Sequence, residues 1–233
     1  MFSDILRKFI LVFVDEILVY SKTLEEHISH LTAVYQILQQ QGFLLKHSKC
    51  SFGQQQLEYL GHIISGQGVA TDPAKLKAIA NWPTPTDTKQ LRGFLGLSGY
   101  YRKFIRYYAT FSRPLTYLLK KQVPFVWTPQ HQHCFEHLKQ ALMTARVLSL
   151  PDFTKGFQVE IDASGIGIGV VLMQDNHPIA YLSKSLGVKA QHLSTYEKEC
   201  LALIMAVSRW KPYLQHKEFT IMTDQRSLLH LME

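Results

Sequence analysis

The chain has 233 residues, which is enough for one or two domains with a buried core. Lys and Arg outnumber Asp and Glu by 25 to 18, and the net charge of +7 is consistent with a polyanionic partner. Three cysteines at unrelated spacings argue against a disulfide framework and for a reducing compartment. No apolar run approaches the roughly 20 residues of a membrane span, and the first residues lack a signal-peptide pattern. We therefore expect a soluble intracellular protein, cytoplasmic or nuclear, with no membrane partner.

Near its start the chain has two apolar, β-rich runs that flank an acidic pair, between Phe9 and Tyr20. This pattern predicts a β-hairpin with Asp15 and Glu16 at its tip. Acidic residues at a turn are usually only solvated. Here the flanking residues are too apolar for a surface hairpin, so we expect both strands to be buried and the acidic pair to be presented for a function.

Local start and stop signals divide the next part of the chain into helices and strands. A capping box at Thr23–Glu26 opens a helix. The run Leu57–Ile64 predicts one strand, followed by a turn and a second strand. Asp72-Pro73 is typical of a helix N-cap and first helical position. Two prolines within Trp82–Asp87 indicate a linker that stops one helix before the next begins.

The next predicted helix, Lys89–Phe104, combines basic and aromatic residues with a glycine at every third position from Gly93. Glycine weakens a helix unless another backbone or a nucleic-acid strand must approach closely. Basic residues interleaved with aromatic ones are typical of a surface that contacts phosphates. In this region they are Lys75, Lys77, Lys89, Arg92, Tyr100, Tyr101, Arg102, Lys103, Phe104 and Arg106. The alternative is that the tyrosines lie in a core and the lysines are only solvated.

A later helix, opened by Trp127–Gln130, carries a cluster that resembles a metal site. Its members are His131, His133, Cys134 and His137. A single helix cannot direct all four side chains at one ion, so separate structural roles are the favoured interpretation.

The second half of the chain is organised around the run Phe157–Asp162, in which apolar and polar residues alternate as in a half-buried strand. The strand breaks after Asp162 at a glycine-rich turn. A second run, Phe219–Asp224, ends in the same way with an aspartate. The glycines of Gly165–Gly169 are not a nucleotide-binding loop, because they join two antiparallel strands and no helix N-terminus follows them.

Between these two strands we predict a helix that begins with the capping box Ser194–Glu197. It should end near Trp210, because Pro212 follows. At 100° per residue, Glu199 lies on the apolar face of this helix, whereas Glu197 is used in the cap. A glutamate on an apolar face needs a reason, and a metal ion is an economical one.

Asp162, Glu199 and Asp224 are together the ligand types of a magnesium site, because a hard cation takes carboxylate oxygens and keeps waters for a reacting phosphate. Three carboxylates packed together repel each other unless cations lie between them. The alternative is that they are three unrelated surface acids.

Seven segments, taken in order, carry a more specific signal. They are Phe13–Ser21, Tyr59–Ser65, Trp82–Pro85, Leu91–Phe104, Leu150–Phe153, Ile161–Ser164 and Tyr196–Glu199. Together they closely resemble the reverse transcriptase and ribonuclease H region of gypsy-type LTR retrotransposon polyproteins. The likeness covers essentially the whole chain, and seven motifs in the right order are far more specific than any one of them.

The resemblance implies a mixed fold, α+β or α/β, in three parts. Residues 1–65 would be the end of the reverse transcriptase palm, 66–144 a helical thumb and connection, and 145–233 a ribonuclease H-like domain of sheet and helices that is incomplete at its C-terminus. In the palm, Asp15 matches the first of two magnesium-binding aspartates, and Glu16 stands where the second is expected.

Further roles follow from the same resemblance. Tyr59, Leu60, Gly61 and His62 look like the segment that grips the primer end. The thumb surface that tracks the duplex would include Lys89, Arg92, Tyr100, Arg102 and Lys103. Asp162, Glu199 and Asp224 fall on the ribonuclease H carboxylates. These roles imply RNA-directed DNA synthesis and cleavage of the RNA strand of a hybrid with Mg²⁺ or Mn²⁺, and they imply an RNA/DNA hybrid and a primer–template duplex as partners.

The departures from the family pattern also matter. Glu16 adds a methylene where placement matters at the scale of an ångström. A further palm aspartate would precede Met1, and a fourth nuclease ligand would follow Glu233. Arg106 and Arg146 stand where the family usually has proline. We therefore expect this chain to keep most of the nuclease site but not to polymerise; the alternative is a non-catalytic, nucleic-acid-binding remnant.

Overall fold

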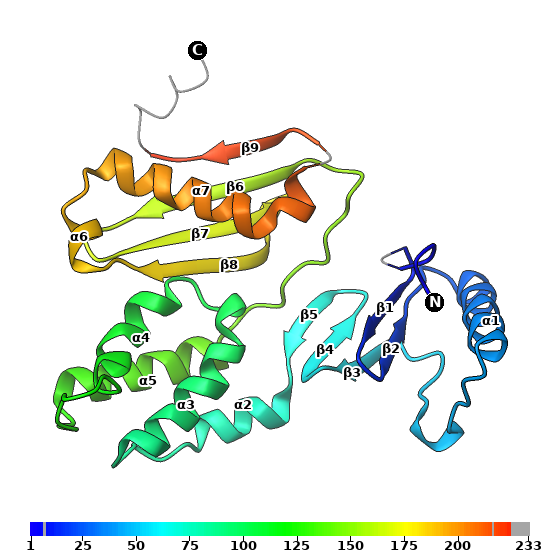
Figure 1. Cartoon of the computed structure of the whole chain (residues 1–233), viewed down its shortest axis with the longest axis horizontal. Coiled ribbons are helices and arrows are strands. Elements are labelled where there is room, and N and C mark those ends of the chain that lie inside the picture. Colours follow the sequence, from blue (N-terminus) through cyan, green and yellow to red (C-terminus); the bar gives the residue numbers. More distant parts are fainter. Residues whose placement is uncertain (7, 216, 225–233) are drawn as a thin grey trace. The chain divides into compact units, whose positions relative to one another are not determined.

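The computed structural model of the chain describes residues 1–6, 8–215 and 217–224 (Figure 1). The chain forms two compact units, one over Met1–Leu60 and the other beginning at Gly61. The helices and strands of both units confirm a mixed α and β fold. Within the described part of the chain, no helix is long and apolar enough to cross a membrane.

The first unit is a β-hairpin followed by a long helix and short elements. The helix begins at the predicted cap, where the Thr23 hydroxyl accepts a hydrogen bond from the backbone N–H of Glu26. The elements are β1 (Ile10–Phe13), β2 (Glu16–Val19), α1 (Leu24–Gln40), the 3₁₀ helix η1 (His47–Lys49) and β3 (Gln56–Tyr59).

The prediction that both strands of the first hairpin are buried is wrong. Ile10 is fully buried and packs with Val34 and Leu38 of α1, so one face of the hairpin is covered. Most of the other side chains are exposed, and Val14 in the turn is 85% exposed. Burying both faces of a sheet requires a layer on each side, and α1 and the segment around Phe2 cover the face that carries Ile10, while Leu11, Val12 and Phe13 remain exposed.

The second unit contains a hairpin, a group of helices and a four-stranded sheet. Its elements are β4 (His62–Ser65), β5 (Gly68–Thr71), α2 (Pro73–Ala80), α3 (Thr88–Tyr100), the 3₁₀ helix η2 (Arg102–Phe104), α4 (Tyr108–Tyr117), α5 (Pro129–Met143), β6 (Phe157–Ala163), β7 (Gly167–Gln174), β8 (His177–Ser185), α6 (Val188–Gln191), α7 (Thr195–Leu214) and β9 (Phe219–Met222).

The single strand predicted over Leu57–Ile64 is interrupted by a turn. Leu60 and Gly61 both have left-handed backbone conformations, with φ of 50° and 66°. Glycine adopts this conformation without steric cost. Leu60 and Gly61 therefore form a turn between the end of β3 at Tyr59 and the start of β4 at His62.

The β4–β5 hairpin is tied to the segment that leads into the four-stranded sheet. Val69 and Leu148 exchange two backbone hydrogen bonds, of 2.8 and 2.9 Å. Gly68 has φ +136°, and a Cβ built there would lie only 2.1 Å from the carbonyl oxygen of Leu148. This close approach therefore requires glycine at position 68.

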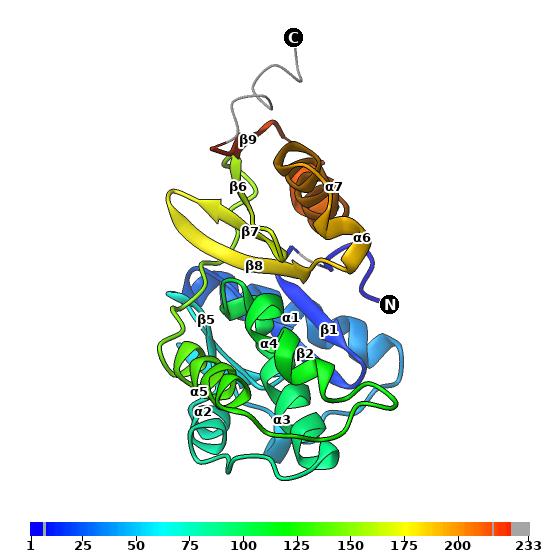
Figure 2. The same ribbon diagram turned by 90° about the vertical axis from the view of Figure 1, so that its left-hand side faces the viewer.

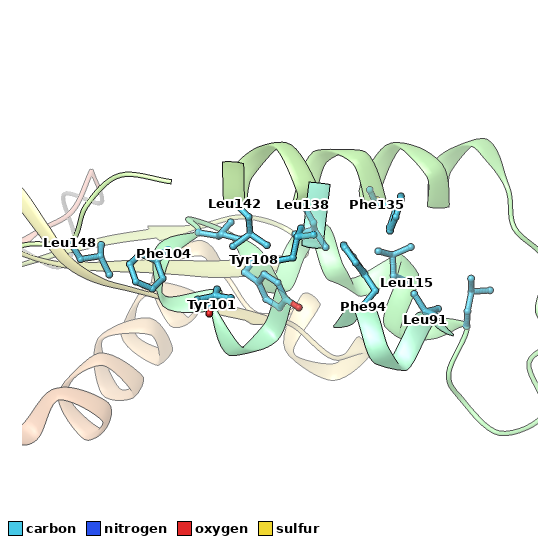
Figure 3. Close-up of a cluster of buried hydrophobic side chains, with 14 residues drawn as sticks. Leu91, Phe94, Tyr101, Phe104, Tyr108, Leu115, Phe135, Leu138, Leu142 and Leu148 are labelled. Atoms are coloured by element: carbon cyan, nitrogen blue, oxygen red, sulfur yellow. The ribbon is translucent and has the colours of Figure 1, made fainter. Parts of the chain in front are cut away.

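Helices α3, α4 and α5 enclose one hydrophobic core (Figure 3). Phe94, Leu115 and Phe135 are fully buried there, and the rings of Phe94 and Phe135 lie 4.5 Å apart. The predicted N-cap at Asp72 is confirmed, and Asp87 caps α3, since each carboxylate accepts a hydrogen bond from the first turn of its helix. Local signals thus place the helices, and their apolar faces assemble the core.

The four-stranded sheet has the order β8-β7-β6-β9. Strand β6 is antiparallel to β7 and parallel to β9. Helix α7 packs on one face of β6 and β7, while α4 and η2 contact β8 (Figure 2). The alternation predicted for β6 is confirmed. Val159 and Ile161 are buried in the core shared with α7, and Glu160 and Asp162, which alternate with them, are half-buried.

Helix α7 is longer than predicted. Its backbone departs from helical geometry at Trp210 (φ −106°, ψ 18°), but the helix continues through Pro212 to Leu214. The regular helix therefore ends at about Trp210, as expected, and Pro212 lies in the short helical turn that follows the kink.

Candidate functional site

The sheet brings two of the predicted carboxyl groups to neighbouring strand ends. In the parallel pair of β6 and β9, Glu160 lies opposite Met222. Asp162 follows Glu160 by two residues within β6, and Asp224 follows Met222, the last residue of β9, by two, so both aspartates lie at the same end of this strand pair. Asp162 is half-buried and Asp224 is exposed.

The third carboxyl group reaches the same end of the sheet from α7. Glu199 is 1% exposed, on the face that packs on the sheet, as the helical periodicity predicted. Glu197 instead accepts a hydrogen bond from the backbone N–H of Ser194 at 2.8 Å, and this capping box is confirmed. Helix geometry therefore gives two glutamates of one turn entirely different surroundings.

The environment of Glu199 shows that the three carboxyl groups interact. Burial raises the pKa of Glu199 above its ordinary value, while a hydrogen bond from the Thr223 hydroxyl lowers it. A hydrogen bond and the negative charge of Asp224 raise this pKa again, and the charge of Asp162 adds to the effect. Both aspartates therefore lie near enough to Glu199 to raise its pKa, Asp224 more strongly than Asp162.

The coupled carboxyl groups do not converge into a ready-made cage. Among the residues that the structure describes, no set of three or more His, Cys, Asp or Glu side chains is placed to hold a metal ion. Asp162 accepts a hydrogen bond from the Tyr107 hydroxyl, and Glu199 accepts one from Thr223. The oxygen donors suit Mg²⁺ chemically, but two of the three carboxylates are engaged by protein hydroxyls.

The sequence did not predict the contact between Tyr107 and Asp162. Tyr107 belongs to the turn between η2 and α4, which lies against β6 and β7. In the same turn Arg106 forms an ion pair with Glu160. No local pattern in the sequence marks this contact, although Gly169 in β7 leaves room for the ring of Tyr107.

The predicted acidic pair of the first unit is located as expected, at the tip of its hairpin. Asp15 lies in the turn, and Glu16 opens β2 opposite Phe13. Both acids are exposed. Burial raises the pKa of Tyr59, and the nearby charge of Glu16 raises it further, so these two predicted site residues lie near each other within this unit.

The predicted nucleic-acid residues of the thumb lie mainly on one stripe of α3. Lys89, Arg92, Gly96 and Tyr100 are spaced by three, four and four residues, and all are exposed. A Cβ at Gly96 would meet no atom within 4 Å, so the middle of the stripe is open. This exposed basic and aromatic face could lie along a phosphate backbone.

The other aromatic residues predicted for that surface have structural roles. Tyr101 and Phe104 are buried in the helical core, so the interpretation of a core position is correct for both. Arg102 is exposed, and Lys103 is half-buried, where burial lowers its pKa. Only part of the predicted surface is therefore available to a ligand.

Within the second unit, Gly61 and His62 of the segment predicted to grip a primer pack against the end of α3. The Tyr101 hydroxyl donates a hydrogen bond to the carbonyl oxygen of Gly61 at 2.7 Å. The His62 ring is buried and lies 5.2 Å from the ring of Tyr100 and 5.7 Å from that of Phe104. Gly61 and the exposed Tyr100 therefore lie close together, and the buried His62 ring packs beneath Tyr100.

Three of the four histidine and cysteine residues predicted as a cluster on α5 make structural contacts. His131 Nδ1 accepts a hydrogen bond from the backbone N–H of Thr128 at 3.1 Å and completes a capping box. The His137 ring stacks on Phe111 at 3.7 Å, and Cys134 is buried in the core.

The four-stranded sheet has α7 on one face and carboxyl groups at one end of its strands. Family models give the class of the chain. Residues 127–221 match the RNase H-like domain found in reverse transcriptase, and residues 1–64 match reverse transcriptase (RNA-dependent DNA polymerase).

The chain is also similar in sequence to curated proteins of retrotransposons. The chain is 38% identical over 225 residues to the retrovirus-related Pol polyprotein from transposon 297 of Drosophila melanogaster, and 35% identical over 234 residues to that from transposon 412 of the same organism. These matches cover 96% and 99% of the chain but 21% and 19% of the relatives, so the chain spans about a fifth of their length. A polyprotein of transposon Tf2-3 from Schizosaccharomyces pombe is 34% identical over 227 residues, which are 94% of the chain and 17% of that polyprotein. The chain therefore carries reverse transcriptase and RNase H-like segments of the kind found in retrotransposon Pol polyproteins.

Solved structures share this fold. The foamy viral protease-reverse transcriptase in complex with RNA/DNA hybrid matches 94% of this chain and 31% of its own chain, with a TM-score of 0.83 and 23% identity. The same viral protein in complex with dsDNA matches 96% of this chain and 48% of its own, with a TM-score of 0.82 and 23% identity.

Proposed function

We propose that the chain is the part of a retrotransposon Pol polyprotein that binds RNA/DNA hybrids and cleaves their RNA strand. In this proposal Asp162, Glu199 and Asp224 hold Mg²⁺ or Mn²⁺ at the strand ends of the four-stranded sheet. The observation that carries it is the buried Glu199, whose pKa is raised by burial and by its two carboxylate neighbours. A coupled acidic group of this kind is costly for folding unless a cation binds to it.

In this proposal the cations and the three carboxylates have separate roles in hydrolysis. Divalent cations, when bound, would make the attacking water more acidic and stabilise the oxygen that leaves phosphorus. Asp162 and Asp224 would approach the scissile phosphate from two adjacent strands, and Glu199 would hold its carboxylate between them from the helix. The hydroxyl of Thr223 keeps Glu199 oriented towards the strand ends.

The partner of this site would be bound through its backbone. The exposed stripe of Lys89, Arg92 and Tyr100 on α3 offers charge for phosphates and one ring for stacking. Solved relatives of the same fold were determined with dsDNA and with RNA/DNA hybrid, which supports both kinds of duplex as partners here. The three free cysteines fit a reducing, intracellular setting for this binding.

The hairpin of the first unit would serve polymerisation in the whole polyprotein. Asp15 lies at the hairpin tip with Glu16 beside it, and both are exposed to a ligand. A single aspartate cannot hold the two cations of phosphoryl transfer, so we propose that this hairpin supplies one ligand to a larger site.

The test is cleavage of the RNA strand of a labelled RNA/DNA hybrid by the full chain in Mg²⁺ or Mn²⁺. We expect metal-dependent cleavage that Asp162→Asn reduces by at least about 100-fold, because losing several kcal/mol of charge stabilisation costs that much in rate. Asp175→Asn is the matched control, since Asp175 lies in the exposed β7–β8 turn and pairs only with Lys155. Equal activity of the wild type and Asp162→Asn would contradict the proposal.

A second candidate function is hybrid binding without catalysis. The hydrogen bond from Tyr107 to Asp162 favours it, because the hydroxyl occupies Oδ2 of the carboxylate and competes with a cation there. Hybrid binding that depends on Lys89 and Arg92, together with no cleavage in either metal, would support this candidate over the nuclease.

A further inference from the structure

The segment Arg106–Thr110 lies against the polar face of β6 and β7. The Tyr107 hydroxyl donates a hydrogen bond to Oδ2 of Asp162, and the Arg106 guanidinium pairs with Glu160, two residues earlier on the same strand. The guanidinium also lies 5.2 Å from the centre of the Tyr107 ring. Two successive side chains therefore engage both acidic residues of this face of β6.

The start of α4 anchors this segment to the sheet. The backbone N–H of Ala109 donates a hydrogen bond to the Ser183 hydroxyl of β8 at 2.9 Å. The residue before α4, Tyr107, makes no side-chain cap, so β8 supplies a partner that the helix itself lacks. The Tyr107 side chain is thereby left for contact with Asp162.

Two glycines of β7 make room for the segment. Gly169 lies opposite Asp162 in the β6–β7 pair, and a Cβ built there would lie 2.4 Å from Cε1 of Tyr107. A Cβ at Gly167 would lie 2.6 Å from the Thr110 hydroxyl oxygen. These glycines give the run Gly165–Gly169 a role that its sequence did not reveal: they let the ring of Tyr107 rest directly on the strand beside Asp162.

The backbone of Tyr107 is unusual for a residue with a side chain. It has φ 57° and ψ 25°, in the left-handed region that large residues seldom occupy. A strained residue persists where its surroundings hold it, and such residues cluster at functional sites. Here the holding contacts are the Asp162 carboxylate and the surface of Gly169.

We propose that Tyr107 is a gate on the carboxylate site, whose hydroxyl competes with a divalent cation for Asp162. The inference rests on the proposed function, because it assumes that Asp162 is a metal ligand. Binding of a cation at Asp162 would break the hydrogen bond and move the Tyr107 side chain, while Arg106 and Ala109 keep the backbone on the sheet. Tyr107 is thus a positioning residue that sets how readily the site takes a metal.

The experiment measures Mn²⁺ binding by electron paramagnetic resonance on the full chain, without substrate. Tyr107→Phe keeps the ring on Gly169 and removes only the hydroxyl, so we expect Mn²⁺ to bind about ten-fold more tightly, the scale of one hydrogen bond to a charged group. In Gly169→Ala the added methyl group displaces the Tyr107 ring and its hydroxyl from Asp162, so Mn²⁺ should again bind more tightly than in the wild type. Tyr117→Phe, at an exposed tyrosine of α4, should leave binding unchanged.

The outcomes separate the gate from the nuclease site. Tighter binding in Tyr107→Phe that disappears when Asp162→Asn is added would support the gate. Binding in the wild type that needs Asp162 but is unchanged or weaker in Tyr107→Phe would overturn the gate and leave the proposed function intact. Absence of Mn²⁺ binding in the wild type, Tyr107→Phe and Gly169→Ala would overturn both.

Discussion

The two acidic strand ends of this chain have opposite surroundings. Asp15 and Glu16 lie on a hairpin that is covered on one face and open at its tip. Asp162 and Glu199 lie at the end of a sheet with α7 on one face and the Arg106–Thr110 segment on the other. Similar residue types therefore differ in hydrogen bonding and charge interactions, because the neighbouring layers set the environment of a carboxylate.

The largest expected effect contrasts the two sheets by removing one leucine from each. Leu172 in β7 is fully buried, and Leu172→Ala should lower the free energy of unfolding by about 2–5 kcal/mol. Leu11 in β1 is 38% exposed, and Leu11→Ala should cost less than about 1 kcal/mol. Urea unfolding with amide exchange on each sheet measures both changes. Similar losses in the two variants would contradict the contrast between covered and uncovered strands.

A second contrast of the same kind lies within one turn, between Gly66 and Gly68. Gly68→Ala should destabilise the chain by about 1–3 kcal/mol, because the methyl group meets the Leu148 carbonyl and φ is left-handed. Gly66→Ala, two residues earlier, meets no atom within 4 Å and should change stability by no more than about 0.5 kcal/mol. Thermal unfolding of both variants is the measurement, and a neutral Gly68→Ala would show that the bridge to Leu148 is not tight.

The smallest expected effect is a pH dependence at the start of α5. His131 must be neutral to accept the hydrogen bond from Thr128, and burial lowers the pKa of His131 below its ordinary value. The unfolded chain then takes up a proton more readily than the folded one. Stability from this cap is therefore complete above a pH of about 6.5 and is lost as the pH falls below it.

The cap can be tested with a residue that does not titrate. His131→Gln can accept the same hydrogen bond at every pH, so it should remove this part of the pH dependence, which is at most about 1 kcal/mol, the scale of one helix cap. The measurement is urea unfolding at pH 7.5 and 5.5 for both proteins. Equal losses in both would assign the pH dependence to other groups.

The features predicted well from the sequence are those that local geometry decides. Caps at Thr23, Asp72 and Ser194 depend on residues within one turn, and each is confirmed. The inward position of Glu199 follows from the helical repeat alone. Sequence reasoning could therefore outline most of the elements and the direction of one acidic side chain.

The features predicted poorly depend on contacts between distant residues. The hairpin strands were expected to be buried because they are apolar, but burial requires a second layer that composition does not reveal. The contact of Tyr107 with Asp162 joins residues 55 positions apart, and no local pattern predicts it. The turn at Leu60 and Gly61 was missed because the apolar run continues through it.

The most direct test of the shared carboxylate site compares two glutamates of one helix. Glu199→Gln and Glu197→Gln make the same chemical change two residues apart, and glutamine can still serve in the capping box. In cleavage of an RNA/DNA hybrid by the full chain with Mg²⁺ or Mn²⁺, we predict a loss of at least about 100-fold for Glu199→Gln and an unchanged rate for Glu197→Gln. Wild-type activity in Glu199→Gln would contradict the claim that this buried carboxylate holds the catalytic cations.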